Sequence, residues 1–251
     1  MKSILKLEGI SFHLKKINQT ILKDITLEIY QSEIFGLTGE SGSGKSTLAK
    51  IISGLEKQTS GKKYFYEKEF WGVEPEHRIQ ILFQNYSASH DPFQKIDSAF
   101  NEILKIKKFK TEDLFRHKKE ILDLVGLSDT VLSLYPGQLS GGQLQRLALA
   151  KLLLLKPPFL ILDEPFASQD FVSIVNLIKI FQQVNQKLKT TFLCISHEIP
   201  FLMKFCDRIG VMKDGEIKDI LTVERKENKI EIKDRHSDYT NFLFQSFGMD
   251  I

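Results

Sequence analysis

The chain has 251 residues, of which 35 are Lys or Arg and 32 are Asp or Glu, giving a formal net charge of +3 at pH 7. This balance excludes a dedicated nucleic-acid arm, and 42% hydrophobic with 27% charged residues excludes a disordered tail. The length suits one large domain, or a domain with a subdomain. No run approaches the roughly 18 to 20 apolar residues that span a bilayer, and we expect no signal peptide.

Cysteine and glycine each carry information. Cys194 and Cys206 form neither a CxxC pair nor a disulfide framework, so we expect reduced, semi-buried thiols in a cytosolic protein. Many of the fifteen glycines fall in two short segments, which contain Gly36, Gly39, Gly42 and Gly44, and then Gly137, Gly141 and Gly142. Glycine concentrated in this way marks backbone that must come close to another group.

Strand patterns dominate the N-terminal part of the chain. Apolar residues alternate with polar ones in residues 4–12 and 25–29, and residues 62–83 return to the strand pattern. Between them, residues 33–38 predict a short buried strand that runs into a glycine-rich loop and then a helical pattern over residues 48–55. Strand, glycine loop and helix is the order that a phosphate-binding site needs.

A helical insert is predicted in the middle of the chain, centred on residues 97–135. With its flanks it covers about residues 85–156 of what we interpret as one domain, residues 1–251. Its apolar residues recur at helical spacing among many lysines, with few strand signals.

Two further buried strands are predicted, at residues 158–163 and 191–196, with an amphipathic helix over residues 171–189 between them. Each strand is a continuous apolar run that ends in a polar residue, which is typical of a parallel sheet covered by helices. The charged stretch 223–235 predicts a solvated edge hairpin or loop.

The glycine loop fits the P-loop pattern GxxxxGK[ST]. It consists of Gly39, Glu40, Ser41, Gly42, Ser43, Gly44, Lys45, Ser46 and Thr47. Glycines let backbone N–H groups point at phosphate oxygens, and the following helix adds its positive end. Lys45 is expected to reach the β and γ phosphates, and the Ser46 hydroxyl to hold Mg²⁺. A glycine-rich turn with an incidental lysine is the alternative, and we predict a nucleoside triphosphate site.

An acid pair follows the strand at residues 159–162. Asp163, at the tip of a neighbouring parallel strand, can reach the Mg²⁺ shell. Glu164, the next residue, can polarise the water that attacks the γ phosphate. Two acids here could also cap a helix, but Pro165 favours an exit from the sheet. The pair therefore predicts hydrolysis by the chain itself.

A second glycine cluster, Leu139–Gln143, reads LSGGQ and precedes a helical run. Serine and glycines at a helix N-terminus make an anion site. Here the sequence resembles the ATP-binding subunit of an ABC transporter, whose signature is LSGGQ. The motifs follow the family's order: Gln84 matches the Q-loop glutamine, Asp170 the D-loop aspartate and His197 the switch histidine.

The resemblance implies a fold and a set of roles. The fold would be α/β: a P-loop NTPase core with a mostly parallel sheet, a small antiparallel β subdomain and a helical subdomain with the signature. The cofactors would be ATP and Mg²⁺. Glu164, His197 and Gln84 would be catalytic, and Ser46, Gln84 and Asp163 would hold the metal.

The resemblance also implies partners. Two such domains, as a homodimer or heterodimer, would pair head to tail. The signature residues would then contact the partner's ATP; these are Ser140, Gly141, Gly142 and Gln143. Integral-membrane permease subunits would dock near residues 85–135, at the cytoplasmic face of the inner membrane, with a solute-binding protein as an indirect partner and no nucleic acid.

Each match has an alternative, and two positions depart from the family. Gln84 could cap its strand, His197 could be structural, and LSGGQ alone could be a capping turn. The D-loop reads Ala-Ser-Gln-Asp over residues 167–170, with Gln169 in place of the usual leucine, which we expect to alter packing across the dimer. For adenine stacking we find only Phe12, which could instead be a core residue, so stacking could also be supplied elsewhere.

Three segments resemble the peptide/nickel importer branch. They are the extended Q-loop at residues 84–92, Tyr135-Pro136 before the signature, and residues 236–240, which match an HPYT segment with one residue inserted and the proline lost. We therefore expect an importer of nickel, another metal chelate, or a di- or oligopeptide. The alternative is a non-transport ABC ATPase acting on DNA or ribosomes, although the stretch between Ser46 and Ser140 is too short for long coiled coils. A P-loop kinase is disfavoured by LSGGQ and Glu164.

Overall fold

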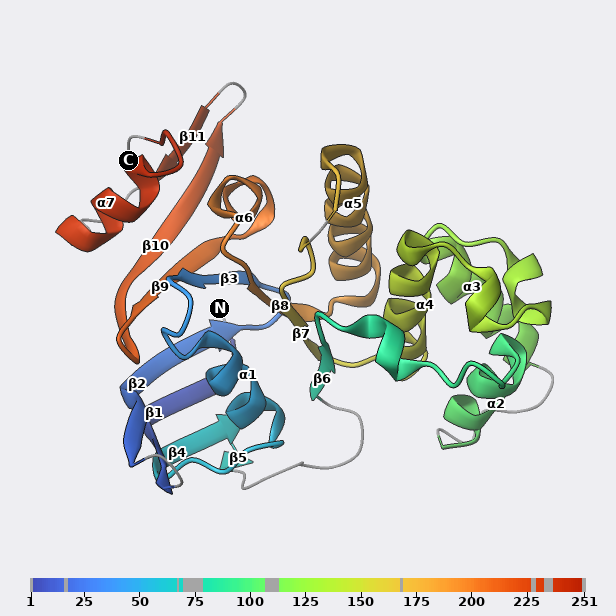
Figure 1. Ribbon diagram of the computed structural model, residues 1–251, viewed down its shortest axis with the longest axis horizontal. Coiled ribbons are helices and arrows are strands. Elements are labelled where there is room, and N and C mark those ends of the chain that lie inside the picture. Colours follow the sequence, from blue (N-terminus) through green and yellow to red (C-terminus); the bar gives the residue numbers. More distant parts are fainter. Residues whose placement is uncertain are drawn as a thin grey trace.

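The computed structural model describes residues 2–15, 18–66, 68–69, 79–106, 113–167, 169–226, 229–232 and 237–249. They form two sheets and a group of helices set to one side (Figure 1). This is the expected α/β fold, with a mostly parallel sheet, a small antiparallel sheet and a helical part.

The main sheet has seven strands in the order β11-β10-β9-β3-β8-β7-β6. In chain order these are β3 (Ile34–Gly39), β6 (Ile79–Leu82), β7 (Phe159–Asp163), β8 (Thr191–Ile195), β9 (Arg208–Lys213), β10 (Glu216–Lys226) and β11 (Lys229–Ile232). Strands β9, β3, β8, β7 and β6 run parallel. Every residue of β3 and β8 is buried, as their apolar runs predict. Of the charged stretch, which was expected to form an edge hairpin or a loop, the described residues 223–226 and 229–232 pair as an antiparallel hairpin at the sheet edge, β10 with β11.

The second sheet is antiparallel, in the order β2-β1-β4-β5. Its strands are β1 (Ser3–Leu14), β2 (Gln19–Tyr30), β4 (Ser60–Phe65) and β5 (Lys68–Glu69). Helix α1 (Lys45–Ser53) packs between the two sheets, and its Leu48, Ile51 and Ile52 are fully buried in a core that both sheets share. The small sheet thereby fixes the helix that follows the P-loop.

The helical part lies beyond β6 and β7 in Figure 1. It contains α2 (Ile96–Ile106), α3 (Leu114–Leu124) and α4 (Gly141–Leu153), with short 3-10 segments at Tyr86–Ser89, Asp129–Ser133 and Pro136–Gln138. Helix periodicity predicted it correctly, while the bounds 85–156 and the single domain stay predictions. Helices α5 (Phe171–Leu188) and α6 (Ile199–Phe205) share a second core with the main sheet and the helical part. Helix α7 (Asp238–Gln245) follows the edge hairpin.

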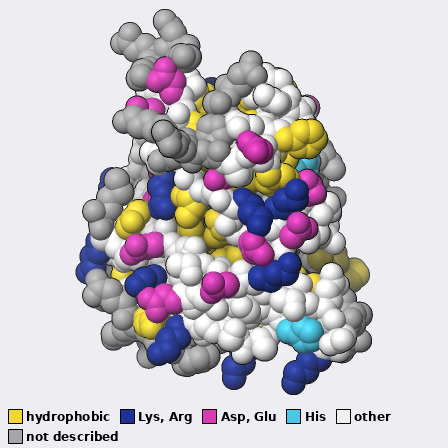
Figure 2. All heavy atoms as spheres, turned by 90° about the vertical axis from the view of Figure 1, so that its left-hand side faces the viewer, with side chains coloured by type: hydrophobic (Ala, Val, Ile, Leu, Met, Phe, Trp, Pro, Cys, Tyr) yellow, Lys and Arg dark blue, Asp and Glu magenta, His cyan; other side chains and the backbone are white. Residues whose placement is uncertain are grey.

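The surface on the side of β2 and β10 carries charges of both signs (Figure 2). A depression there is lined by Lys23, Asp24, Glu216 and Lys218, among others. Among the described helices, none combines the length and the apolar character that a membrane crossing requires.

The prediction for the cysteines was wrong in one respect. Cys194 and Cys206 are free thiols but fully buried, not semi-buried. Burial raises the pKa of both thiols. Gly36 explains why Cys206 can be buried so completely. It lies on β3 as the register partner of Cys194, and a Cβ atom at Gly36 would lie 3.1 Å from Cys206 Sγ. The glycine leaves the room that the Cys206 side chain fills.

Candidate functional site

The P-loop connects β3 to α1, and its geometry requires two of its glycines. Gly39 has φ +144°, and a Cβ atom there would lie 2.1 Å from the backbone oxygen of Met212. Gly44, the N-cap of α1, has φ +102°, and its Cβ atom would lie 2.6 Å from a side-chain carbon of Leu22. A side chain at either position would clash and strain the backbone. The loop is therefore packed against β9 and β2 at the start of α1.

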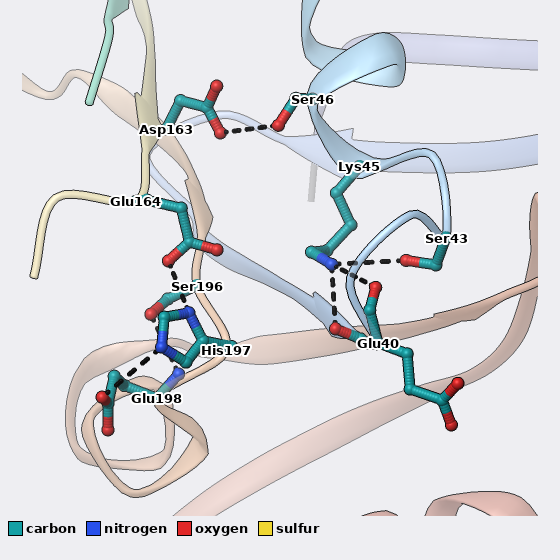
Figure 3. A network of polar contacts seen from close by, with 10 residues as sticks. Glu40, Ser43, Lys45, Ser46, Asp163, Glu164, Ser196, His197 and Glu198 are labelled. Atoms are coloured by element: carbon teal, nitrogen blue, oxygen red, sulfur yellow. Dashed lines mark hydrogen bonds and ion pairs between the residues drawn. The ribbon is translucent and has the colours of Figure 1, made fainter. Parts of the chain in front are cut away.

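Lys45 bends back over its own loop (Figure 3). Its Nζ donates hydrogen bonds to the backbone oxygens of Gly39 and Glu40, both at 2.8 Å, and to Ser43 Oγ at 3.3 Å. Burial lowers the pKa of Lys45, and the nearby acids, led by Glu164, oppose that shift. A partly desolvated cation in this loop is suited to bind phosphate oxygens.

Ser46 and Asp163 connect α1 to the end of β7. Ser46 Oγ donates a hydrogen bond to Asp163 Oδ1 at 3.2 Å (Figure 3). Burial raises the pKa of Asp163, while the hydrogen bond from Ser46 and the charges of Lys50 and Lys45 lower it. A hydroxyl and a carboxylate are the hard oxygen ligands that Mg²⁺ prefers. The residues present therefore fit the predicted metal role.

Glu164 and His197 form a contact pair. His197 Nδ1 lies 3.0 Å from Glu164 Oε2, and His197 Nε2 lies 3.6 Å from Glu198 Oε1 (Figure 3). Glu164 has φ +52°, a left-handed conformation, and its N–H donates to the backbone oxygen of Ile195 at 2.9 Å. A residue held in a strained conformation beside a phosphate loop is a sign of a functional constraint.

Most of the residues predicted to bind this chain's own nucleotide line one cavity of about 570 Å³. It is lined by Ile21, Gly39, Ser41, Gly42, Gly44, Lys45, Ser46, Thr47, Gln84, Glu164 and His197. Asp163 is not in this lining, but it accepts a hydrogen bond from Ser46, which is. Phe12 is not among the lining residues; it is partly buried against the core, opposite Leu22, and its adenine-stacking role stays a prediction. Ile21 was missed, because a single apolar residue in an alternating strand carries no functional signal.

The signature residues lie at the start of α4 and do not line this cavity. Ser140 Oγ accepts a hydrogen bond from the Gln143 N–H at 3.3 Å, and the Ser140 N–H donates to Gln143 Oε1 at 2.9 Å. This capping box holds the first turn of the helix. Ser140, Gly141 and Gly142 are exposed, so they are accessible to a second chain.

The Q-loop packs on the signature helix, a contact that the sequence did not suggest. His90 Nε2 lies 3.3 Å from the backbone oxygen of Leu144, and Lys151 Nζ donates to the backbone oxygen of Ser89 at 2.8 Å. The Tyr86 hydroxyl lies 3.7 Å from the place of a Cβ atom at Gly141. Burial lowers the pKa of His90, so its neutral form is favoured.

The D-loop ends at Asp170, which caps α5 by accepting hydrogen bonds from the N–H and the hydroxyl of Ser173 at 3.0 and 2.6 Å. Ser168 lies outside the described residues. Gln169, the departure from the family pattern, donates a hydrogen bond to Gln145 Oε1 on α4 at 2.5 Å. Its side chain therefore has a partner within its own chain, and the predicted effect on packing across a dimer stays a prediction. Residues 227–228 and 233–235 of the charged stretch and His236 of the HPYT-like segment also lie outside the described residues.

The similar known sequences are import ATP-binding proteins. The methionine import ATP-binding protein MetN of Streptococcus pneumoniae serotype 4 is 35% identical over 228 residues, which cover 86% of this chain and 64% of the relative. The chain thus spans less than two thirds of that protein's length. The nickel import ATP-binding protein NikE of Escherichia coli K12 is 33% identical over 241 residues, 89% of each chain.

Solved structures agree with the fold. CbiO1 from Clostridium perfringens, part of the ABC transporter complex cbiONQ, has a TM-score of 0.78 and 25% identity, with 88% of each chain covered. A dimeric ATP-binding cassette in a post-hydrolysis state, bound to ADP and Pi, has a TM-score of 0.75 and 25% identity, covering 87% of this chain and 98% of that one. The sequence model of the family described as ABC transporter matches residues 22–167, more than half of the chain. With the P-loop, the acid pair and the signature in place, this match shows that the chain belongs to the ABC transporter family.

Proposed function

We propose that the chain is the ATP-binding and ATP-hydrolysing subunit of an ABC importer, which couples hydrolysis to uptake of a small solute through separate permease subunits. One observation carries this proposal. A single cavity is lined by the P-loop cation Lys45, the hydroxyl of Ser46, and Glu164 in contact with His197. A phosphate-binding loop facing a carboxylate that can accept a proton is the arrangement that hydrolysis of a nucleoside triphosphate needs.

Each side chain has one task in this mechanism. The P-loop amides and Lys45 bind the phosphates, and Ser46 with Asp163 and Gln84 would hold Mg²⁺. When bound, Mg²⁺ neutralises charge on the phosphate oxygens. Glu164 accepts the proton of the attacking water. The Glu164 carboxylate lies beside Nδ1 of His197, and the Glu198 carboxylate lies beside Nε2. The imidazole orients the Glu164 carboxylate.

A second cassette would complete the site. The signature serine and glycines are exposed at a helix N-terminus and lie outside the cavity of their own chain. Such a helix end attracts an anion, and the γ phosphate of a nucleotide on a partner cassette is the anion that head-to-tail pairing supplies. The dimeric form of a related cassette bound to ADP and Pi supports this reading. The partner is a copy of this chain or a related chain.

The permease would dock beside the Q-loop, at the cytoplasmic face of the cell membrane. A groove of about 710 Å³ there has an apolar lining that includes Leu82, Phe83, Ile103, Leu152 and Leu155. A concave apolar surface next to Gln84 suits an amphipathic helix of a membrane subunit. Binding there would couple the permease to Gln84, which lines the nucleotide cavity.

For the solute we propose nickel or another metal chelate, or a di- or oligopeptide. Support comes from the Q-loop segment 84–92 and from the similarity to a nickel import protein over 89% of both chains. The relatives are import proteins for methionine, sulfate and nickel, and they do not favour an ATPase that acts on DNA or ribosomes.

The first test measures the rate of ATP hydrolysis by the wild type and by Glu164→Gln. The second isolates the chain from its native membranes and identifies the proteins that come with it. We expect turnover to fall by about 10²-fold or more in the variant, while ATP still binds. We also expect permease subunits to co-purify, and deletion of the chain to abolish uptake of radioactive nickel or of a labelled dipeptide. Wild-type turnover by Glu164→Gln would show that the base is wrongly assigned, and co-purification with DNA or ribosomes would overturn the importer.

A further inference from the structure

Two side-chain amides join the signature helix to the D-loop within one chain. Gln145, on the second turn of α4, is only 3% exposed. Its Nε2 donates a hydrogen bond to the backbone oxygen of Pro165 at 2.7 Å, and its Oε1 accepts one from Gln169 Nε2 at 2.5 Å. We call Gln145 and Gln169 the amide pair.

The orientation of the amide pair follows from its partners. The backbone oxygen of Pro165 can only accept a hydrogen bond, so the NH₂ group of Gln145 must face it. Oε1 of Gln145 must then face Gln169, which has to present its own NH₂ group. A buried amide oxygen without a donor is costly, so the residue at position 169 decides whether Gln145 is satisfied.

The amide pair makes hydrogen bonds at both ends of the short turn that follows Glu164. Pro165 follows the proposed base Glu164 directly, and the Ala167 N–H donates to the Glu164 backbone oxygen at 3.3 Å. The Gln169 N–H donates to the backbone oxygen of Phe166, also at 3.3 Å. Helix α4 is thus bonded to the turn beside the base and again at the D-loop.

We propose that Gln169 is a positioning residue for the hydrolysis step, acting through Gln145 to hold the D-loop and the turn after Glu164 against the signature helix. This inference rests on the proposed ATPase function. Neither amide lines the nucleotide cavity, which is built from other elements. Loss of the amide pair is therefore expected to lower turnover and to leave binding of ATP unchanged.

Glutamine-to-methionine substitutions test this, because methionine keeps the length of the side chain and removes the amide. The measurement is steady-state ATP hydrolysis by the full chain in its native complex. For Gln169→Met we expect kcat to fall about tenfold with KM for ATP within twofold of the wild type. The control is Gln183→Met, the same change on the exposed face of α5, with wild-type values expected.

A double-mutant cycle separates positioning from a general loss of structure. Gln145→Met removes the acceptor of the amide pair, so adding Gln169→Met is expected to lower kcat by less than twofold more. Thermal unfolding of each variant checks that the chain is folded. The proposal is overturned if Gln169→Met has the wild-type kcat, if it changes KM alone, or if its tenfold loss is repeated in full in the Gln145→Met background.

Glu164→Gln is measured in parallel, so that the two proposals fail separately. If the wild type does not hydrolyse ATP, or Glu164→Gln is as active as the wild type, the proposed function fails. If Glu164→Gln abolishes turnover while Gln169→Met turns over normally, only the role of Gln169 fails.

Discussion

His197 Nδ1 lies 3.0 Å from Glu164 Oε2, and sheet register brings the two residues together. Asp163, the last residue of β7, is the register partner of Ile195, the last residue of β8. Glu164 and His197 follow these positions closely, so the carboxyl ends of two parallel strands present them at one edge of the sheet. The pairing of β7 with β8 therefore brings Glu164 and His197 together.

His197→Ala is expected to lower ATP turnover by about 10²-fold, because the Glu164 carboxylate loses the group that orients it. Affinity for ATP is expected to stay within about threefold, since Lys45 and the P-loop remain. Turnover and the dissociation constant for a fluorescent ATP analogue are the measurements. Glu198→Gln changes the acid on the other ring nitrogen, 3.6 Å away, and serves as the control. Equal losses in both variants would contradict the special role of the contact with Glu164.

Local patterns predicted the elements that carry chemistry. The P-loop, the acid pair and the signature are each a short run of sequence in which the order of residues itself determines the local geometry. Gly39 and Gly44 illustrate this, because their positive φ values are needed wherever such a loop packs. The parallel sheet followed from continuous apolar runs.

Contacts between distant segments could not be predicted in this way. The hydrogen bond from Gln169 to Gln145 and the contact of His90 with the backbone of Leu144 link residues far apart in sequence. Neither shows in periodicity, because a glutamine on an apolar helix face looks the same whether or not it has a partner. The full burial of Cys206, which follows α6, likewise depends on Gly36, which lies on β3. Such features arise from tertiary packing and need the folded chain.

Phe93 is predicted to anchor the permease. It is 89% exposed, and its N–H donates to Asp91 Oδ1 at 2.9 Å, which holds the turn that presents it beside the Q-loop. An exposed aromatic residue on an ordered turn is suited to fill a pocket on a partner. Phe93→Ser is expected to reduce co-purification of permease subunits at least tenfold, with little change in thermal stability.

Phe115→Ser provides the matched control. Phe115 is 59% exposed on α3 and belongs to the same helical part of the chain, but it is not on the Q-loop. The two variants are compared by the amount of permease recovered with an affinity-tagged chain. An equal loss in both, or none in Phe93→Ser, would contradict docking through Phe93.

Gly36→Ala is predicted to destabilise the fold by about 1–3 kcal/mol, the usual cost of overpacking a core. The added Cβ atom would lie 3.1 Å from Cys206 Sγ and 3.2 Å from Ile209 Cγ1, in the middle of the main sheet. Gly137→Ala is the control, because a Cβ atom there would have nothing within 4 Å. Urea unfolding of both variants measures the difference. A Gly36→Ala protein as stable as Gly137→Ala would show that the core has room at Cys206.

Lys63 is predicted to make stability depend on pH. Its side chain, on β4, is fully buried, and Nζ donates to the backbone oxygen of Ile51 in the last turn of α1 at 2.6 Å. Burial lowers the pKa of Lys63 from 10.5 to about 8. Between these two pH values the unfolded chain binds a proton that the folded chain has released, so the free energy of unfolding rises with pH. The gain reaches at most about 3 kcal/mol.

The measurement is the free energy of unfolding in urea at pH 7 and at pH 10, for the wild type and for Lys63→Met, which removes the titrating group. The difference between the two proteins is expected to shift in favour of the wild type as the pH rises, because the buried ammonium loses its charge while the hydrogen bond to Ile51 can persist. Lys62→Met, at the exposed neighbouring position of β4, controls for the loss of one lysine. If both variants show the same dependence on pH, Lys63 is not the group that titrates. If the shift favours Lys63→Met, then the folded chain holds the proton more tightly than the unfolded chain, and burial does not dominate at Lys63.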